Sequence, residues 1–191
     1  MKIASSAIVI ISLVLSAFLA WSKSTIILGQ LAFWTLTLVI FTKPLARLFP
    51  TIGLFKTLLA LRRYTGIASG IFVIAHVLSQ ILPGFGLTDI LSYAASAGPR
   101  DFQFWGLIGL ILILPLLVTA NNFATNLLKR NWFRLHKLIH PLYIVILVHR
   151  ALQPKPGYLL TSIVIFILLY GSRLLAARDT QFFVPKLTNQ A

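Results

Sequence analysis

The sequence predicts an all-α membrane protein, a single domain over residues 1–191 with six transmembrane helices and both termini in the cytoplasm. Hydrophobic residues make up 58% of the chain and charged residues only 10%, and the mean hydropathy is +0.91. Soluble domains rarely combine these values. Six runs are apolar enough and long enough to cross a bilayer, which takes roughly 17 to 25 residues per helix. The basic residues cluster between these runs.

The predicted spans are residues 3–21, 25–41, 65–82, 103–120, 135–151 and 158–175. The first run could also be read as a removable signal peptide, because Lys2 is a short basic start and Ala20 a conceivable cleavage point. However, Phe18 stands three residues before such a cut, where a small residue is required, and the second run follows almost at once. We therefore expect the first run to remain in the protein as a span.

The loops between the spans are too short for a soluble domain. The two longest cover about residues 42–64 and 83–102. In the first of them, the stretch TIGLFKTLLALRRY (residues 51–64) has apolar residues interrupted by Lys56 and Arg62. This pattern predicts an interfacial helix whose basic side chains reach the lipid headgroups.

The basic residues set the predicted orientation. Of the 17 Lys and Arg residues, 13 fall on the side of the termini and four on the other side. Cytoplasmic loops are enriched in Lys and Arg, so the side of the termini is predicted to be cytoplasmic. The net charge of +14 would suggest nucleic acid in a soluble protein. Here it fits topology signals facing anionic lipid, and we expect no nucleic-acid partner.

Cysteine is absent from the chain, which excludes disulfides, thiolate catalysis and cysteine-bound metal or iron–sulfur sites. A cofactor must therefore bind through nitrogen or oxygen. The chain has four histidines, and ionisable residues inside a membrane point to function. At 1.5 Å per residue from the cytoplasmic ends of their spans, His76 lies roughly 17 Å deep and His149 roughly 21 Å deep. His136 lies at the inner surface and His140 roughly 7 Å deep.

Similar depth makes His76 and His149 a facing pair. Two imidazoles without a nearby carboxylate or thiolate suit zinc poorly. A low-spin haem b needs two axial nitrogens, an apolar slot and cations for its propionates. Gly66 and Gly70 are expected to thin the third helix beside such a slot. Three cations lie on the same outer side for the propionates: Arg100, Arg150 and Lys155.

Each histidine also has a simpler interpretation. His76 and His149 can merely hydrogen-bond a neighbouring helix, and His136 can face headgroups or solvent. His140 can cap or pack near a kink at Pro141. His136 and His149 are separated by roughly 19.5 Å of helix rise, which suits one haem in each leaflet. They share a face only if the helix unwinds locally, as Pro141 allows.

Three segments resemble the ferric-reductase-like transmembrane domain family. They are RRYTGIASG before His76, LPLLVTANN at the end of the fourth span, and KRNWFRLHKLIHPLYIVILVHRAL around the other three histidines. The spacing of 60 residues from His76 to His136 and of 13 to His149 matches the family. Within it, the chain looks most like the MsrQ-type haem-binding subunit of the periplasmic methionine sulfoxide reductase system. The likeness covers about residues 62–152.

The resemblance implies a membrane cytochrome b with His76 and His149 as axial ligands of one outer haem. In the two-haem members of the family, another ligand lies about fourteen residues before the third-helix histidine, and here Arg62 holds that position. His136 is therefore implied as a second ligand without its partner, or as an electron-entry residue. The segment GPRDFQFWG departs from the family's basic loop because it has only Arg100. His140 is not part of the family pattern.

No nicotinamide- or flavin-binding domain is expected, because nothing in the chain resembles a Gly-rich strand–helix turn with a later ribose-binding acid. Electrons must then come from quinol, from a bound FMN or from a cytoplasmic flavin reductase. Arg62 and Arg63 lead the cytoplasmic cations that can attract a flavin phosphate or an acidic flavoprotein, although topology alone also explains them. We therefore expect the chain to act as an electron-transfer subunit rather than as a self-sufficient enzyme.

The resemblance further implies the bacterial inner membrane as location and a periplasmic, molybdenum-dependent methionine sulfoxide reductase as acceptor. Two other functions remain open. One is a haem-containing ferric or quinol-linked reductase with another acceptor. The other, of a different class, is a haem-free small transporter or assembly factor whose histidines relay protons.

Overall fold

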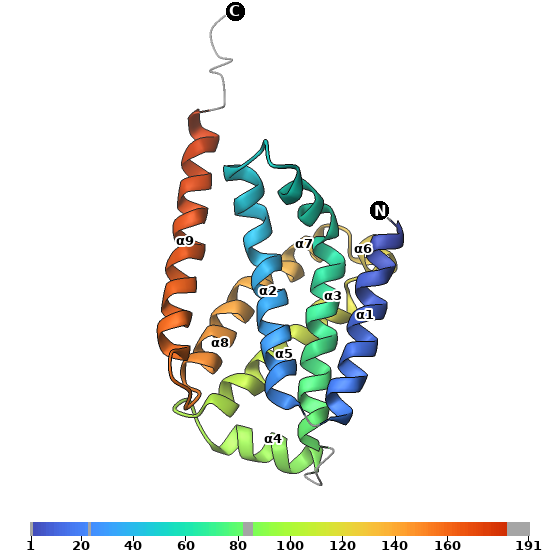
Figure 1. Cartoon of the computed structure of the whole chain (residues 1–191), viewed down its shortest axis with the longest axis vertical. Helices are drawn as coiled ribbons and strands as arrows, with labels where there is room; N and C mark the ends of the chain where they lie inside the picture. Colours follow the sequence, from blue (N-terminus) through green and yellow to red (C-terminus); the bar gives the residue numbers. More distant parts are fainter. Residues whose placement is uncertain (1, 23, 82–85, 183–191) are drawn as a thin grey trace, which may run out of the picture.

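The computed structural model describes residues 2–22, 24–81 and 86–182, and these residues form helices and connecting turns without any strand. The α-helices are α1 Lys2–Trp21, α2 Thr25–Leu48, α3 Gly53–Ile81, α4 Leu87–Ser96, α5 Phe102–Val118, α6 Asn122–Leu128, α7 Arg130–Leu135, α8 Ile139–Ala151 and α9 Tyr158–Phe182. A 3₁₀ turn, His136–Leu138, joins α7 to α8. The long helices run up and down one bundle, and α4 lies across one end of it (Figure 1).

Four described helices are long and apolar enough to cross a membrane: α1, α2, α3 and α9. A fifth span is reached only if α5 and α6, which bend by 91° at their junction, count as one. The all-helical class and several apolar helices are thereby confirmed. With 13 residues, α8 is about 20 Å long, well short of the roughly 30 Å hydrocarbon core. The predicted span over residues 135–151, and with it the total of six spans, therefore stays a prediction.

The predicted interfacial helix is continuous with the third span. Residues from Gly53 to Ile81 form one helix of 29 residues, about 43 Å long, which exceeds the hydrocarbon core of roughly 30 Å by two to three turns. No proline interrupts it, so the polar first turns can remain helical. In Figure 1 these first turns lean across the end of the bundle opposite α4.

The loop predicted at residues 83–102 contains a helix, α4, which the sequence reading did not anticipate. Its start is stabilised by Asp89, whose carboxylate accepts a hydrogen bond from the Gly86 backbone N–H at 3.0 Å. Its residues Ile90, Leu91 and Ala94 line a cavity inside the bundle, so α4 covers that cavity. Residues 82–85 of the same loop lie outside the described part of the chain.

The predicted fifth span is broken at its start. The 3₁₀ turn at His136–Leu138 directly precedes α8, where Pro141 occupies an early helical position. The first backbone N–H groups of a helix have no partner within it, so proline is tolerated there. The chain is therefore locally unwound from α-helix to a 3₁₀ turn at His136–Leu138, just before Pro141.

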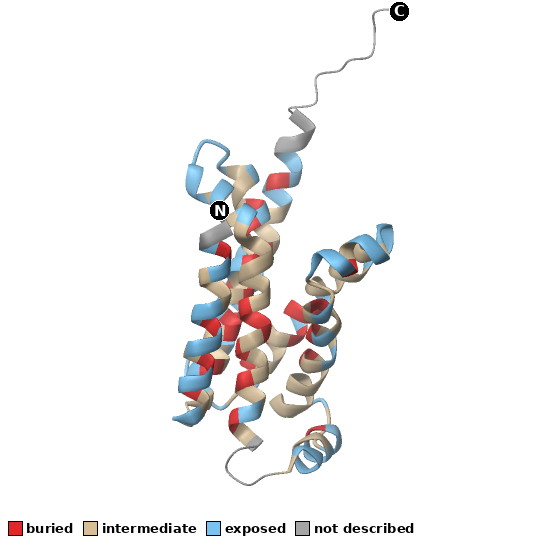
Figure 2. Ribbon diagram, turned by 90° about the vertical axis from the view of Figure 1, so that its right-hand side faces the viewer, coloured by how far each residue is buried: buried red, intermediate tan, exposed pale blue. Residues whose placement is uncertain are grey.

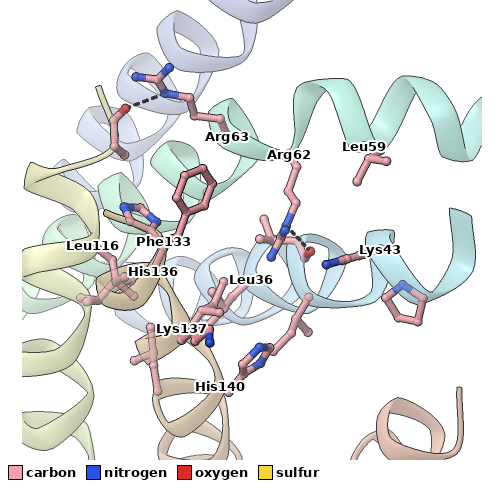
Figure 3. A pocket seen from close by; sticks show the side chains of 18 of the residues that line it. Leu36, Lys43, Leu59, Arg62, Arg63, Leu116, Phe133, His136, Lys137 and His140 are labelled. Atoms are coloured by element: carbon pink, nitrogen blue, oxygen red, sulfur yellow. Dashed lines mark hydrogen bonds between the residues drawn. The ribbon is translucent and has the colours of Figure 1, made fainter. Parts of the chain in front are cut away.

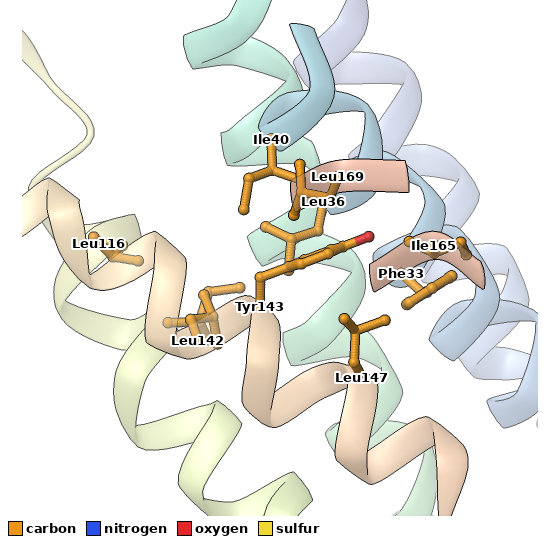
Figure 4. Close-up of a cluster of buried hydrophobic side chains, with 10 residues drawn as sticks. Phe33, Leu36, Ile40, Leu116, Leu142, Tyr143, Leu147, Ile165 and Leu169 are labelled. Atoms are coloured by element: carbon orange, nitrogen blue, oxygen red, sulfur yellow. The ribbon is translucent and has the colours of Figure 1, made fainter. Parts of the chain in front are cut away.

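A core of buried side chains joins α2, α5, α8 and α9 (Figure 4). Tyr143 of α8 is at its centre, only 1% exposed, and its hydroxyl is 2.8 Å from the Thr37 hydroxyl of α2. A second cluster packs α1, α2 and α3 around small residues such as Ala32, Ala68 and Ala75. Small residues let membrane helices approach closely. Figure 2 shows the buried residues inside the bundle and exposed ones on its outward faces.

Candidate functional site

His76 is held by the neighbouring helix α2. Its Nδ1 is 2.8 Å from the backbone carbonyl oxygen of Thr25. A carbonyl can only accept, so Nδ1 carries the ring proton and donates, and the lone pair is on Nε2. The ring lies against Gly29, because a Cβ built there would be 3.2 Å from Cε1 of His76.

His149 is held in the same way by α5. Its Nδ1 is 2.7 Å from the carbonyl oxygen of Phe102, so Nδ1 donates and Nε2 again keeps a lone pair. A Cβ built at Gly106 would be 3.1 Å from Cε1 of His149. The Phe102 ring packs beside the imidazole at 5.7 Å between centroids. The carbonyls used, Thr25 and Phe102, belong to the first residues of α2 and α5.

A glutamine follows each of these histidines by four residues. The amide nitrogen of Gln80 is 3.5 Å from Nε2 of His76, and that of Gln153 is 3.0 Å from Nε2 of His149. Gln80 lies within α3, where side chains tilt toward the N-terminus, so a residue at i+4 reaches back over residue i. Gln153 lies just beyond the end of α8. The two histidines therefore have matching surroundings: a carbonyl at Nδ1, a glycine against the ring and a glutamine beside Nε2.

Both histidines line one cavity of about 430 Å³, which we call the histidine-pair cavity. This volume falls in the usual range for cofactor and small-ligand pockets. Most of the remaining lining is aliphatic or aromatic, and Gly29 and Gly106 belong to it. The facing pair that the sequence predicts is thus brought to a single apolar cavity.

Arg150 supplies a buried cation at the same cavity. It is only 8% exposed, and its guanidinium lies between the rings of Phe33 and Tyr158, 4.4 and 3.9 Å from their centroids. One terminal nitrogen donates to the Gln30 side-chain oxygen at 3.0 Å, whereas Nε is buried without a protein partner. Lys155 also lines this cavity. Arg100, the third predicted propionate cation, is exposed and is not among the lining residues.

A second cavity of about 770 Å³, the basic cavity (Figure 3), is lined by the C-terminal half of α2, the N-terminal half of α3 and the start of α8, among other segments. Its described lining includes no Asp or Glu but six cations: Lys43, Arg47, Arg62, Arg63, Lys137 and Arg173. His136 and His140 line it as well. Leu36, Ile113 and Leu142 line both cavities. A single layer of aliphatic side chains therefore separates the two.

His136 and His140 differ from the facing pair in the protonation of their rings. The Thr119 hydroxyl donates to the Pro115 carbonyl oxygen at 2.6 Å, so its oxygen accepts from Nε2 of His136 at 3.1 Å. The His136 ring also stacks on Trp132 at 3.9 Å. His140 accepts at Nδ1 from Arg173 at 3.0 Å, which leaves its proton on Nε2. Only His76 and His149 present an Nε2 lone pair to a cavity.

Arg62 and Arg63 are held mainly by backbone groups. Nε of Arg62 donates to the carbonyl oxygen of Val39 at 3.2 Å. Arg63 donates to the carbonyl of Ala120 at 2.9 Å and to the Asn122 side chain at 2.6 Å. Figure 3 shows Arg62 and His136 among the side chains around the basic cavity.

The sequence reading did not identify the glycines and glutamines beside the histidines. Gly66 and Gly70, which were expected to make room on α3, do not face a histidine. A Cβ at Gly66 meets nothing within 4 Å, and one at Gly70 meets Leu117. The only sequence signal for the glutamines is their position four residues after His76 and His149.

Comparison with known proteins now identifies the family. The model of the family described as "ferric reductase like transmembrane component" matches residues 28–147. The chain belongs to this family. The match includes His76 and His136 and ends two residues before His149. The resemblance inferred from the three sequence segments is confirmed, and with its apolar helices this family member is a multi-pass protein of the bacterial inner membrane.

Two similar relatives carry the name protein-methionine-sulfoxide reductase heme-binding subunit MsrQ. The protein of Agrobacterium fabrum is 32% identical over 129 residues, which cover 68% of this chain and 57% of the relative. That of Brucella ovis is 30% identical over 110 residues, 58% of this chain and 49% of the relative. The family member described here thus spans about half the length of the curated relatives it matches. No solved structure matches it.

Proposed function

We propose that this chain is a membrane cytochrome b subunit that carries electrons from the cytoplasmic side or the quinone pool to a periplasmic reductase. The observation that carries the proposal is the pair of Nε2 lone pairs of His76 and His149, which line one apolar cavity. The relatives are named as heme-binding subunits, and the geometry is what such a group needs.

The donor set supports haem rather than a hard metal ion. Within the described residues no cluster of three His, Cys, Asp or Glu side chains could hold a metal ion, and zinc sites normally need three or four protein ligands. Two neutral imidazoles are the axial set of a low-spin haem b, whose iron supplies reversible one-electron chemistry when bound. A backbone acceptor at Nδ1 fixes the tautomer and orientation of a ligating histidine.

The remaining lining matches the rest of a haem. Apolar side chains of α2, α3, α5 and α8 make up most of the lining of the cavity. Arg150 and Lys155 supply positive charge for the propionates, and the unpartnered Nε of Arg150 has a donor to offer. Arg100 lies outside this lining, so its contribution would be to a docking partner rather than to the propionates.

The basic cavity supports a role in electron entry. Its cations favour an anionic donor, in keeping with the FMN, quinone or cytoplasmic flavin reductase that the sequence suggests. His136 lies there with its stacked Trp132, as an electron-entry residue or, after a change of tautomer, as a second ligand. Arg62 stands where the family resemblance places the opposite ligand and hydrogen-bonds a carbonyl instead.

The topology that fits this direction has six spans and cytoplasmic termini, with α8 and the preceding turn as the fifth. α1 begins and α9 ends at the same end of the bundle, opposite α4 (Figure 1). An even number of spans places both termini on the same side of the membrane, so this arrangement fits six spans. The excess of Lys and Arg at that end favours the cytoplasm. The histidine-pair cavity then faces the periplasm, where we propose a molybdenum-dependent methionine sulfoxide reductase as the acceptor.

Optical spectroscopy tests the proposal. Protein purified in detergent should show a reducible Soret band with about one haem per chain, as expected for one bis-histidine site. His76→Ala and His149→Ala should each remove the low-spin spectrum. His140→Ala is the matched control and should keep it, because that ring has its proton on Nε2 and lines the other cavity. A colourless wild-type protein would refute the haem assignment and favour the proton-relaying transporter or assembly factor.

The acceptor is tested separately. Reduced wild-type protein that transfers electrons to ferric chelates without any periplasmic protein would support the ferric or quinol-linked reductase. Oxidation only by a periplasmic methionine sulfoxide reductase would support the proposed partner.

A further inference from the structure

The histidine-pair cavity contains two glycines whose missing side chains decide where the imidazoles lie. A Cβ on Gly29 would be 3.2 Å from Cε1 and 3.3 Å from Nδ1 of His76. A Cβ on Gly106 would be 3.1 Å from each of the corresponding atoms of His149. Carbon atoms pack best at about 3.5 to 4.0 Å. An alanine at either position would therefore push the ring away by a few tenths of an ångström.

The spacing of these glycines has a geometric reason. In an α-helix the N–H of residue i bonds the carbonyl of residue i−4, so residue i lies directly above that carbonyl on the same face. Gly29 is four residues after Thr25, and Gly106 is four residues after Phe102. An imidazole ring that donates to the first-turn carbonyl must therefore lie over the residue one turn later. The ring can approach the helix closely only if that residue has no side chain.

We propose that Gly29 and Gly106 are positioning residues for the two iron ligands, His76 and His149. Each glycine sets the distance between imidazole and helix at which Nδ1 keeps its carbonyl and Nε2 points into the cavity. The inference rests on the proposed haem ligation and adds to it that α2 and α5 hold the two rings by the same device. Neither helix contributes a ligand itself, yet both determine the ligand geometry.

The other glycines of the bundle provide matched controls. Gly171 lies within α9 and Gly53 is the first residue of α3, and a Cβ at either position meets nothing within 4 Å. Neither glycine lines the histidine-pair cavity. Gly171→Ala and Gly53→Ala therefore test the effect of adding a methyl group to a helix glycine away from the cavity.

The experiment compares Gly29→Ala and Gly106→Ala with these controls. Each protein is purified with its haem, and three quantities are measured: haem retention on dilution, the midpoint potential, and the low-spin ferric signal in electron paramagnetic resonance. Both variants should retain haem about tenfold more weakly, the low end for changes beside a metal ligand, with a shifted potential and low-spin signal. Gly53→Ala and Gly171→Ala should match the wild type in all three.

A second comparison separates position from folding. In His149→Gly protein supplied with free imidazole, the ring is no longer tethered to α8 and can settle slightly farther from α5. Adding Gly106→Ala should then leave haem retention unchanged, whereas an equal loss would show that alanine harms folding and would overturn the inference. If the wild type binds haem but Gly29→Ala and Gly106→Ala match the control variants in all three quantities, this inference alone would be overturned. A wild type without haem would overturn the proposed function, and this inference with it.

Discussion

The buried hydrogen bond between Tyr143 and Thr37 should make the two partners unequal in their effect on stability. The Thr37 hydroxyl is 2.8 Å from the Phe33 carbonyl oxygen as well as from the Tyr143 hydroxyl. After Tyr143→Phe, Thr37 keeps the carbonyl as its partner. After Thr37→Val, the Tyr143 hydroxyl remains in a side chain that is 1% exposed, without the partner it had.

The magnitudes follow from that difference. Interhelical hydrogen bonds in membranes average about 0.6 kcal/mol, so Tyr143→Phe should lower the free energy of unfolding by about that amount. A buried hydroxyl left unsatisfied costs about 1 to 3 kcal/mol, so Thr37→Val should cost more. Removing both groups removes the unsatisfied hydroxyl, and the double variant should be more stable than Thr37→Val alone.

Reversible unfolding of the purified protein in mixed micelles, followed by circular dichroism, measures all three variants against the wild type. A cost of Tyr143→Phe equal to or above that of Thr37→Val would refute the reasoning. Simple additivity in the double variant would also refute it, because it would show that the two hydroxyls do not interact.

Two further predictions concern the cations. Arg150→Met should weaken haem retention about tenfold, which corresponds to the loss of one charge-assisted hydrogen bond of roughly 1.5 kcal/mol. Arg100→Met changes an exposed position outside the cavity and should leave haem retention unchanged. Equal effects of the two variants in a haem-retention assay would contradict the assignment of Arg150. Reduction of the haem by an anionic flavin donor should slow as ionic strength rises, because salt screens attraction over about 10 Å at 0.1 M. Lys43→Gln at the basic cavity should reduce that salt dependence, and a stopped-flow rate insensitive to salt would argue against electron entry there.

Much of the fold follows from composition and spacing, because a bilayer requires long apolar helices whatever their tertiary contacts. This is why α1 and α9 begin at or within one residue of the starts of the predicted spans 3–21 and 158–175. The exceptions arise where local chemistry competes with hydropathy. Pro44 lies within α2, which continues to Leu48, and the helix α4 is too short to register as an apolar run.

The candidate site was predictable only in part. Depth counting places His76 and His149 at similar levels, and the structure brings them to one cavity. Depth counting cannot say which ring nitrogen carries the proton, because the position of the proton depends on the carbonyls of Thr25 and Phe102, which belong to other helices. The same limit hides Gly29 and Gly106, since a glycine becomes informative only when the helix packed against it is known.

The layer of Leu36, Ile113 and Leu142 between the two cavities has an energetic consequence. These three side chains have no hydrogen-bonding group, so they cannot relay protons, while an electron needs only a short gap to tunnel. Outward transfer across this layer would then move negative charge alone. Because the cytoplasm is negative, the membrane voltage would drive that step, by up to about 2.3 kcal/mol per 100 mV for a charge crossing the whole bilayer. The aliphatic layer would thus let the protein draw on the cell's electrical potential while remaining proton-tight.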